Sequence, residues 1–217
     1  MTIHTFTFNP FSENTYVIAD ATGECIIIDP GMMDREEDQE IYDFIERNKL
    51  SPKLVLNTHC HIDHILGNDS ATRKFGIELW AHELDVPTLE RGEAASMLWS
   101  IPYRTSPMPN KFINEGDIVR FGNTELEILF VPGHAPGHLA FIHHASQSIL
   151  SGDVLFKESV GRVDLPGCNK EDLGRSIREK LYTLPDDYIV YPGHGPTTTI
   201  GHEKANNVFV RSNYSAF

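Results

Sequence analysis

"LVLNTHCHIDHILGN", residues 54–68, is the stretch that decides how this sequence is interpreted. An apolar run typical of a buried strand ends at Leu56, and three histidines and an aspartate follow between positions 59 and 64. His59 and His61 are two residues apart, so both side chains point the same way on an extended segment. This spacing differs from the i, i+4 histidine pair on a helix that zincin proteases use. The stretch predicts a metal site in a loop after a strand.

Three further segments place a histidine or an aspartate in a Gly-containing turn after an apolar strand. They are His134 in "LFVPGHAPGH", Asp153 in "SILSGDVLF" and His194 in "IVYPGHG". The resulting set of ligand-type residues is too large for one four-coordinate zinc ion, but suits two ions that share a carboxylate and keep open positions. Imidazole and carboxylate ligands suit zinc, iron or manganese, and the lack of clustered cysteines argues against a structural zinc knuckle.

Composition narrows the class of protein. The chain has 217 residues, enough for one domain with a sizeable core. A net charge of −13 disfavours binding to nucleic acid through a broad basic face, whereas a small anionic substrate is compatible with metal ions in the site. Three cysteines do not make a disulfide framework, and the N-terminal residues carry no secretory signal pattern. The apolar runs are too short to span a membrane. We therefore expect a cytoplasmic enzyme with no nucleic-acid or membrane partner.

Apolar periodicity predicts a mixed sheet protein with helices packed outside. Helices are expected at 34–50, 67–76, 85–99 and 169–184. Strands are expected at 3–8, 14–20, 23–31, 52–59, 77–82, 117–134, 137–145, 147–156 and 187–195. The segment 83–111 is the least regular and contains a Pro-rich loop.

"THCHIDH" (58–64) resembles the T-H-x-H-x-D-H signature of the metallo-β-lactamase superfamily, and the later "PGHAPGH", "SGDVLF" and "YPGHG" match its remaining metal motifs in order. The resemblance implies an α+β fold of the αββα sandwich type, as a single domain over residues 1–217 without a C-terminal helical substrate domain. It implies two divalent metal ions, with zinc expected and iron or manganese as alternatives. One ion would take His59, His61 and His134; the other would take Asp63, His64 and His194; Asp153 would bridge them. In the same resemblance Asp29 of "IIIDPG" orients the His-rich loop. Of the two roles open to His138 in "PGHLAF", supporting the site or binding metal, we expect the first.

Within the superfamily the chain looks most like the short bacterial form of glyoxalase II, the hydroxyacylglutathione hydrolases. The stretches that carry this likeness are "GRVDLPG" (161–167) and "TTIGHEKANNVF" (198–209). Glyoxalase II enzymes hold glutathione partly with a basic residue nine positions after the bridging aspartate, and Arg162 occupies that place. Longer members carry a Tyr where this chain has Asp164. Arg162 is therefore either a substrate contact or the partner of Asp164 or Glu158.

The expected reaction is the hydrolysis of a small-molecule thioester, S-lactoylglutathione to lactate and glutathione with weak glutathione specificity. Asp63 and Asp153 are the expected catalytic carboxylates. Water held by two divalent cations becomes nucleophilic near neutral pH. A thiol has a pKa of about 8.5, so a thiolate leaves without a general acid, whereas an amide nitrogen needs a proton. This favours thioesters over β-lactams.

Three other functions are compatible with the same motifs. A persulfide dioxygenase uses one iron on two histidines and one carboxylate, and it would leave Asp63, His64 and His194 without metal. A lactone or ester hydrolase would use the same dinuclear site. The third is a metal-binding module without enzymatic activity. We expect a monomer or a dimer, and we expect Cys60, which lies between two ligands, to point away from the metals and to serve packing.

Overall fold

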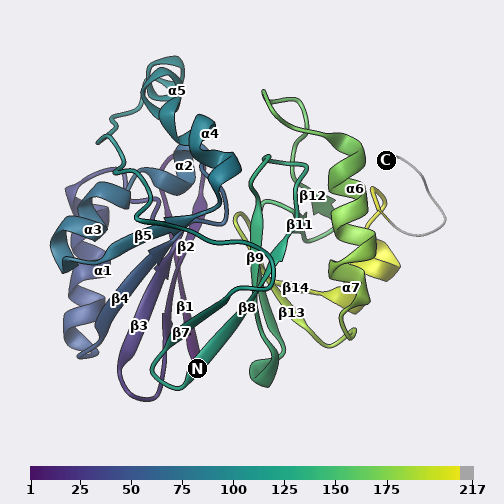
Figure 1. Cartoon of the computed structure of the whole chain (residues 1–217), viewed down its shortest axis with the longest axis horizontal. Helices are drawn as coiled ribbons and strands as arrows, with labels where there is room; N and C mark the ends of the chain where they lie inside the picture. The colour runs from purple at the N-terminus through teal and green to yellow at the C-terminus, as the bar shows by residue number, and fades with distance from the viewer. Residues whose placement is uncertain (211–217) are drawn as a thin grey trace. The chain divides into compact units, whose positions relative to one another are not determined.

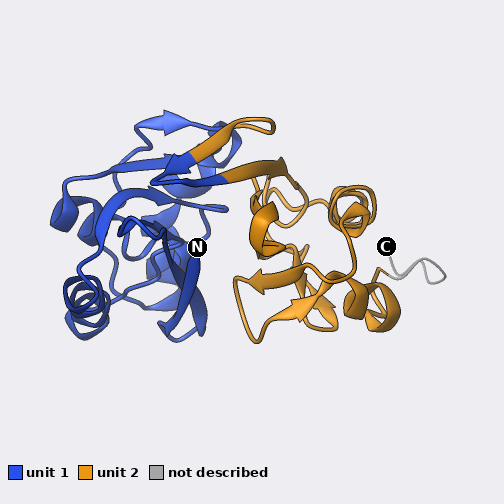
Figure 2. Ribbon diagram, turned by 90° about the horizontal axis from the view of Figure 1, so that it is seen from below, with its two compact units in different colours: residues 1–113, 120–125 blue, residues 114–119, 126–217 orange. Residues whose placement is uncertain are grey.

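A computed structural model describes residues 1–210, and the chain forms two compact units. The first comprises residues 1–113 and 120–125, and the second comprises residues 114–119 and the chain from 126 onwards (Figure 2). Residues 211–217, the end of the single domain expected over 1–217, lie outside the described residues. Among residues 1–210, no helix is both long and apolar enough to cross a bilayer.

The first unit is built on a six-stranded sheet in the order β1-β2-β3-β4-β5-β6 (Figure 1). Its strands are β1 (Thr2–Phe8), β2 (Glu13–Ala19), β3 (Glu24–Ile28), β4 (Ser51–Leu56), β5 (Glu78–Ala81) and β6 (Lys111–Phe112). Pairing is antiparallel from β1 to β3 and parallel from β3 to β6. The parallel strands therefore end at one edge of the sheet, and the His-rich stretch follows one of them, β4.

Two helices cover one face of this sheet. Helix α1 (Arg35–Arg47) begins after Asp34, whose side chain accepts hydrogen bonds from the backbone N–H groups of Glu36 and Glu37. Helix α3 (Asn68–Phe75) ends at Gly76, which has the left-handed φ of 64° that glycine tolerates. The apolar core between helices and sheet includes Ile41, Ile45, Ala71, Val17, Ile27, Val55 and Leu79.

The helix expected over 85–99 is not continuous, which corrects that prediction. The segment forms a 3₁₀ turn, η1 (Glu83–Asp85), followed by two short helices, α4 (Val86–Glu90) and α5 (Gly92–Trp99). At the break, a Cβ on Gly92 would lie 2.6 Å from the hydroxyl oxygen of Tyr103. This close approach of the loop, which sequence periodicity does not reveal, accompanies the change of direction.

The second sheet has the order β14-β13-β10-β9-β8-β7, in which β10 and β13 are parallel (Figure 1). Its strands are β7 (Ile118–Phe121), β8 (Thr124–Phe130), β9 (Leu139–His143), β10 (Ser148–Gly152), β13 (Ile189–Pro192) and β14 (Thr198–Thr199). Residues 120–125, at the end of β7 and the start of β8, belong to the first unit, and the rest of this sheet belongs to the second unit. Its other elements are the hairpin of β11 (Leu155–Phe156) and β12 (Ser159–Val160), helices α6 (Lys170–Glu179) and α7 (Ile200–Asn206), and the 3₁₀ turns η2 (His144–Ser146) and η3 (Leu181–Thr183).

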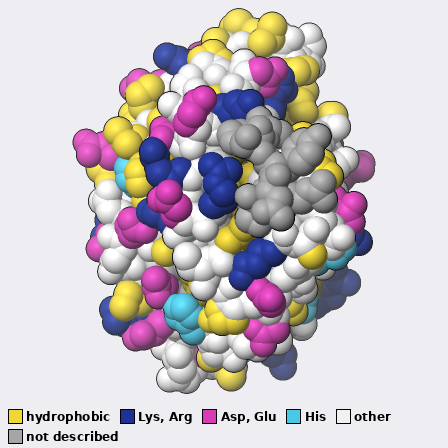
Figure 3. Space-filling view, turned by 90° about the vertical axis from the view of Figure 1, so that its right-hand side faces the viewer, with side chains coloured by type: hydrophobic (Ala, Val, Ile, Leu, Met, Phe, Trp, Pro, Cys, Tyr) yellow, Lys and Arg dark blue, Asp and Glu magenta, His cyan; other side chains and the backbone are white. Residues whose placement is uncertain are grey.

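Helices α6 and α7 pack on the sheet of the second unit through an apolar core. This core includes Leu173 and Ile177 of α6, Ile200 of α7, and Ala140, Ile142, Ile149 and Val190 of the sheet. On the face shown in Figure 3, Lys and Arg side chains are mixed with Asp and Glu side chains. Ion pairs of the second unit include Lys180 with Glu115 at 2.7 Å and Lys204 with Asp186 at 2.6 Å.

Each predicted metal ligand follows a strand, as the sequence indicated. In the first unit, the segment from His59 to His64 follows β4 and contains the short helix α2 (Ile62–Ile65). In the second unit, His134 follows β8, Asp153 follows β10 and His194 follows β13. The strands thus present the ligand-type side chains from loops on a rigid frame.

Candidate functional site

Three imidazoles gather in the first unit. The ring centroids of His59 and His64 are 4.1 Å apart, and those of His59 and His61 are 4.8 Å apart. His61 is the N-cap of α2 and has an extended backbone, so the chain turns into the helix directly after it. That turn places Asp63 and His64 beside each other, with 3.6 Å between Asp63 Oδ2 and His64 Nε2.

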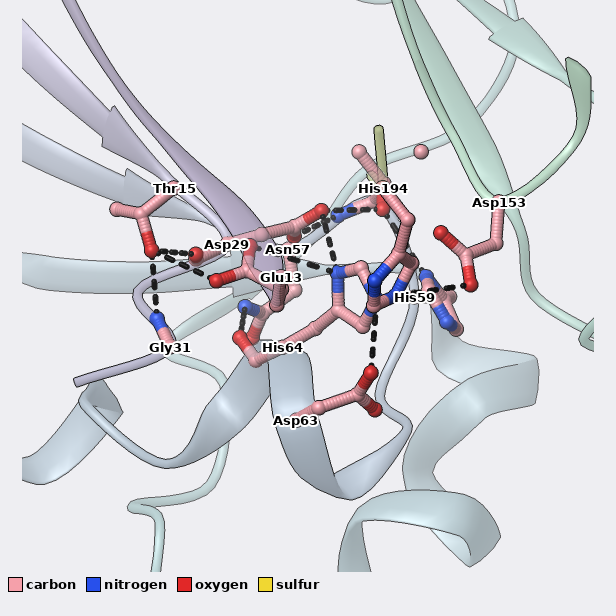
Figure 4. A network of polar contacts seen from close by, with 12 residues as sticks. Glu13, Thr15, Asp29, Gly31, Asn57, His59, Asp63, His64, Asp153 and His194 are labelled. Atoms are coloured by element: carbon pink, nitrogen blue, oxygen red, sulfur yellow. Dashed lines mark hydrogen bonds and ion pairs between the residues drawn. The ribbon is translucent and has the colours of Figure 1, made fainter. Parts of the chain in front are cut away.

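Asp29 is hydrogen-bonded to His64 directly and to His59 through Thr58 (Figure 4). His64 Nδ1 lies 3.2 Å from Asp29 Oδ2, so the Nδ1–H donates to the carboxylate and Nε2 faces Asp63. The Thr58 hydroxyl donates to the same oxygen at 2.5 Å, and the Thr58 backbone N–H donates to Oδ1 at 2.7 Å. Because the hydroxyl proton is committed to Asp29, His59 Nδ1, 3.1 Å from Thr58 Oγ1, must be the donor of that contact. Both histidines therefore keep Nε2 as the basic nitrogen.

A buried acid, Glu13, lies beside this network. Its Oε1 is 3.8 Å from His64 Nδ1, and its Oε2 is 2.8 Å from the hydroxyl of Thr15. That hydroxyl also contacts the carbonyl of Asp29 and accepts from the N–H of Gly31. Burial raises the pKa of Glu13 well above its usual value, and the positive charge available to His64 opposes the shift. Glu13 therefore favours its neutral form.

Backbone groups of the ligand segment are also fixed by side chains. The buried carboxylate of Asp85 accepts from the N–H of Cys60 at 2.8 Å, and Asn9 donates to the carbonyl of Asp63 at 3.1 Å. Cys60 packs in an apolar cluster with Ile62, Ile65 and Leu89, and burial raises the pKa of its thiol. A raised thiol pKa makes Cys60 a poor nucleophile.

In the second unit, Asp153 lies between two histidines. Its Oδ2 is 3.5 Å from Nε2 of His134 and also 3.5 Å from Nε2 of His194. The side chain of Asp153 is only 10% exposed, and that of His134 only 2%. One carboxylate oxygen is thus equally distant from two imidazoles that the sequence resemblance assigns to different metal ions.

Main-chain groups set the tautomers of the histidines in this unit. His134 Nδ1 is 2.9 Å from the carbonyl of Arg162, which can only accept, so the proton lies on Nδ1 and Nε2 faces Asp153. His138 Nδ1 donates to the carbonyl of Leu139 at 3.0 Å, and its Nε2 accepts from the N–H of Asp153 at 3.0 Å. His138 is completely buried and holds the backbone of Asp153.

Arg162 forms a two-pronged ion pair with Asp164. Its Nε and Nη2 donate to the two carboxylate oxygens at 2.6 and 2.8 Å. The pair is exposed, and the guanidinium holds the pKa of Asp164 at about 2. Of the alternatives left open for Arg162, pairing with Asp164 is the contact that the structure contains. A substrate carboxylate would have to compete with it.

The spacing of the donor atoms tests whether a divalent ion fits. A tetrahedral zinc ion with bonds of about 2.0–2.1 Å sets its ligand atoms roughly 3.4 Å apart. The separations from His134, His194 and His64 to their aspartates are 3.5, 3.5 and 3.6 Å. These values exceed the usual N–H···O range of up to about 3.2 Å. The Nε2 atoms of His64 and His134 are also left basic by their Nδ1–H bonds. The separations and these basic nitrogens fit metal ligation within each unit.

Three other histidines, His82, His143 and His144, have structural contacts. His82 is buried and accepts from the N–H of Leu84 at the start of η1. His143 ends β9 and bonds to Ser146, whereas His144 lies in η2 between Glu127 and Tyr188. Sequence reasoning missed Glu13 and Asp85. Each acid acts on the His-rich segment from a distant part of the chain, and no local pattern marks such a role.

A family model described as the metallo-β-lactamase superfamily matches residues 8–194. The chain belongs to the metallo-β-lactamase superfamily. It has the fold of that family, mixed α/β with two sheets and helices, as the resemblance implied. Among curated relatives, "Hydroxyacylglutathione hydrolase GloC" of Haemophilus influenzae is 37% identical over 214 residues, which cover 98% of this chain and 99% of the relative.

Solved structures of superfamily members match over nearly the whole chain. "BLEG-1 B3 metallo-beta-lactamase" superposes with a TM-score of 0.86 and 31% identity, covering 96% of this chain and 99% of that one. "TTHA1623 in a di-iron-bound form" gives a TM-score of 0.86 and 35% identity, covering 95% and 99%. "ETHE1 from Myxococcus xanthus" gives 0.80 and 26%, covering 97% and 84%. Membership of the superfamily, with these relatives, supports a metal-dependent hydrolase.

Proposed function

We propose that the protein is a dinuclear, metal-dependent thioester hydrolase of the glyoxalase II kind. The observation that carries the proposal is the place of Asp153 Oδ2, 3.5 Å from Nε2 of both His134 and His194. One shared carboxylate oxygen with an imidazole on each side is the arrangement that two ions with a bridging ligand need. Likeness over nearly full length to a relative named hydroxyacylglutathione hydrolase supports the thioester as substrate.

The ligands proposed are His59, His61 and His134 for one ion, Asp63, His64 and His194 for the other, and Asp153 for both. Two divalent ions would lower the pKa of a bound water and polarise the carbonyl of the substrate. Three ligand histidines would keep an unprotonated Nε2 for the metal, because their Nδ1–H groups donate to fixed acceptors. His64 donates to Asp29, His134 donates to the Arg162 carbonyl, and His59 donates to Thr58, whose hydroxyl donates to Asp29. Zinc is the metal proposed, and the di-iron form of a similar structure makes iron the alternative to test.

The chain itself offers apolar surface near Asp63 for the acyl or thiol portion of a substrate. Phe11 lies in the turn whose Asn9 donates to the Asp63 carbonyl, and its ring meets that of Trp99 edge to face at 5.4 Å. Met97 and Leu98, next to Trp99 at the end of α5, are 71% and 78% exposed. We therefore propose that the protein tolerates different apolar thioesters. The Arg162–Asp164 pair argues against a strong preference for glutathione, because a substrate carboxylate would have to compete with Asp164.

Metal analysis combined with a substrate panel tests the proposal. The protein is loaded with zinc, iron or manganese and assayed with S-lactoylglutathione, a neutral thioester, a lactone, a β-lactam and glutathione persulfide. We expect two ions per chain and thiol release from both thioesters at rates well above hydrolysis of the β-lactam.

A persulfide dioxygenase is the second candidate, because the same motifs would supply the two histidines and one carboxylate of a single iron site, and a similar structure, TTHA1623, is known in a di-iron-bound form. If the protein binds one iron per chain and consumes oxygen with glutathione persulfide as substrate, the dioxygenase replaces the hydrolase as the proposed function. Two ions with faster turnover of the lactone than of either thioester would keep the site and change the substrate class.

A further inference from the structure

Glu203 is a buried acid in the "TTIGHEKANNVF" stretch, which contributes none of the proposed metal ligands. It is 0% exposed, and its carboxylate accepts three hydrogen bonds. Oε1 accepts from the hydroxyl of Thr198 at 2.5 Å, and Oε2 accepts from the backbone N–H of Glu158 at 2.9 Å and from the amide of Asn207 at 2.8 Å. A carboxylate removed from water and bound by three donors is a rigid anchor.

These bonds attach α7 to the β11–β12 hairpin. Glu158 lies in the turn between the two strands and has a left-handed φ of 57°, which a non-glycine residue adopts only when its surroundings hold it there. Asn207 adds a second attachment by donating to the carbonyl of Ser159 at 2.9 Å. The tip of the hairpin is thus held by side chains from the end of α7.

The base of the hairpin lies against two proposed metal ligands. Gly161, directly after β12, has no room for a side chain, since a Cβ there would be 1.9 Å from the carbonyl oxygen of Asp153 and 3.0 Å from the ring of His134. The next residue, Arg162, supplies the carbonyl that accepts from His134 Nδ1. A shift of the hairpin therefore moves the group that fixes the tautomer and ring orientation of His134.

We propose that Glu203 is a positioning residue for the metal ligands of the second unit, acting through the β11–β12 hairpin on His134 and Asp153. This inference rests on the proposed role of these two residues as ligands. Without Glu203, the Glu158 N–H and the Asn207 amide lose their acceptor, and the hairpin tip keeps the weaker attachments from Asn207 to the Ser159 carbonyl and from His202 to the exposed Glu158 carboxylate.

The experiment measures zinc affinity by competition with a chromophoric chelator, with the folded fraction checked by circular dichroism. Glu203→Ala should weaken zinc binding by about tenfold. This is the lower end of the loss expected when a group that orients a metal ligand is removed. Glu203→Gln should restore it to within about threefold of wild type. Its amide oxygen accepts from both N–H donors, and its NH₂ meets the Thr198 hydroxyl, which accepts as well as donates.

Lys204→Ala is the matched control. Lys204 is the next residue of α7, and its ammonium bonds to the carbonyl of Leu184 and to Asp186, away from the hairpin. It should leave zinc affinity unchanged. An equal loss of affinity in Glu203→Ala and Lys204→Ala would overturn the proposal, because the effect would then follow the stability of α7 alone.

A second readout needs no metal. In the metal-free protein, the amide of Glu158 should exchange with deuterium at least about tenfold faster in Glu203→Ala than in wild type or Glu203→Gln. If Glu203→Ala does not fold, Asn207→Ala, which removes the bond to the Ser159 carbonyl, should show the same two changes at smaller size. Wild-type zinc affinity in a folded Glu203→Ala or Asn207→Ala overturns the inference. A wild-type protein that binds one ion contradicts the proposed dinuclear site instead, and the deuterium exchange still decides the anchoring role.

Discussion

The two units hold their metal-ligand residues in different ways. In the first, four ligand-type residues lie within 59–64, and a buried carboxylate, Asp29, supports two of the histidines through side-chain bonds. In the second, His134, Asp153 and His194 come from three separate loops, and the Arg162 carbonyl and the buried ring of His138 fix the first two of them. In the first unit the ligand histidines are oriented by bonds to side chains. In the second, the bonds that orient the ligands involve main-chain groups, the Arg162 carbonyl and the Asp153 N–H. The units should therefore respond differently to the same kind of substitution.

The largest effect is expected at Asp153, the residue of the second unit that lies between two histidines. Asp153→Ala should reduce metal content below one ion per chain and lower kcat/KM for thioester hydrolysis by more than about 100-fold, beyond the effect of supporting groups. Elemental analysis and a thiol-release assay measure both. Asp187→Ala, an exposed change in the same unit, serves as the control. Two retained ions with more than about a tenth of the activity would show that Asp153 is not a shared ligand.

Residues that hydrogen-bond to the proposed ligands should affect zinc affinity more in the first unit than in the second. Asp29→Ala should weaken zinc binding by about 10–100-fold, because both His59 and His64 lose their orientation. His138→Ala should weaken zinc binding by about tenfold or less, since the bond from His138 to Asp153 goes to its main chain and not to its carboxylate. Asp34→Ala removes the N-cap of α1 and should lower stability without changing zinc affinity. A larger loss in His138→Ala than in Asp29→Ala would reverse the comparison.

Glu13 gives the first unit a dependence on pH. Its pKa is raised by burial, so its contribution to stability is complete below the unfolded pKa of about 4.3 and is lost as pH rises toward the folded pKa. Glu13→Gln removes the ionisation that favours the unfolded state. The metal-free variant should therefore melt higher than wild type at pH 7, and the difference should shrink at pH 4. A difference that grows on acidification would mean that Glu13 is charged in the folded protein.

The smallest effects are expected at the exposed pair of Arg162 and Asp164. Asp164 stays ionised at neutral pH because Arg162 holds its pKa at about 2. If Arg162 binds a glutathione carboxylate, Asp164→Asn should lower KM for S-lactoylglutathione by at most about fivefold, and Arg162→Ala should raise it, since exposed ion pairs contribute little. A neutral thioester is the control substrate and should respond to neither change. Equal responses of both substrates would make Arg162 structural.

The family and its fold could be predicted from sequence because spacing is a local property. "THCHIDH" sets the order of ligand types along a few residues, and the apolar runs before it, and before the turns that carry Asp153 and His194, mark the strands that present them. The prediction of one helix over 85–99 was wrong, because the chain forms two short helices with a break at Arg91. Gly92 leaves no room for a Cβ beside Tyr103, and periodicity does not report such a tertiary approach.

The supporting groups were decided by tertiary structure. Asp85 reaches the N–H of Cys60 across 25 positions, and Glu203 reaches the N–H of Glu158 across 45. A buried acid has no periodic signature, and its partner is whichever donor the packed chain brings to it. By itself, the sequence determined which side chains can bind metal. Only the folded chain determined which nitrogen of His64 and His134 carries the proton, because that depends on the acceptor that folding places against each ring.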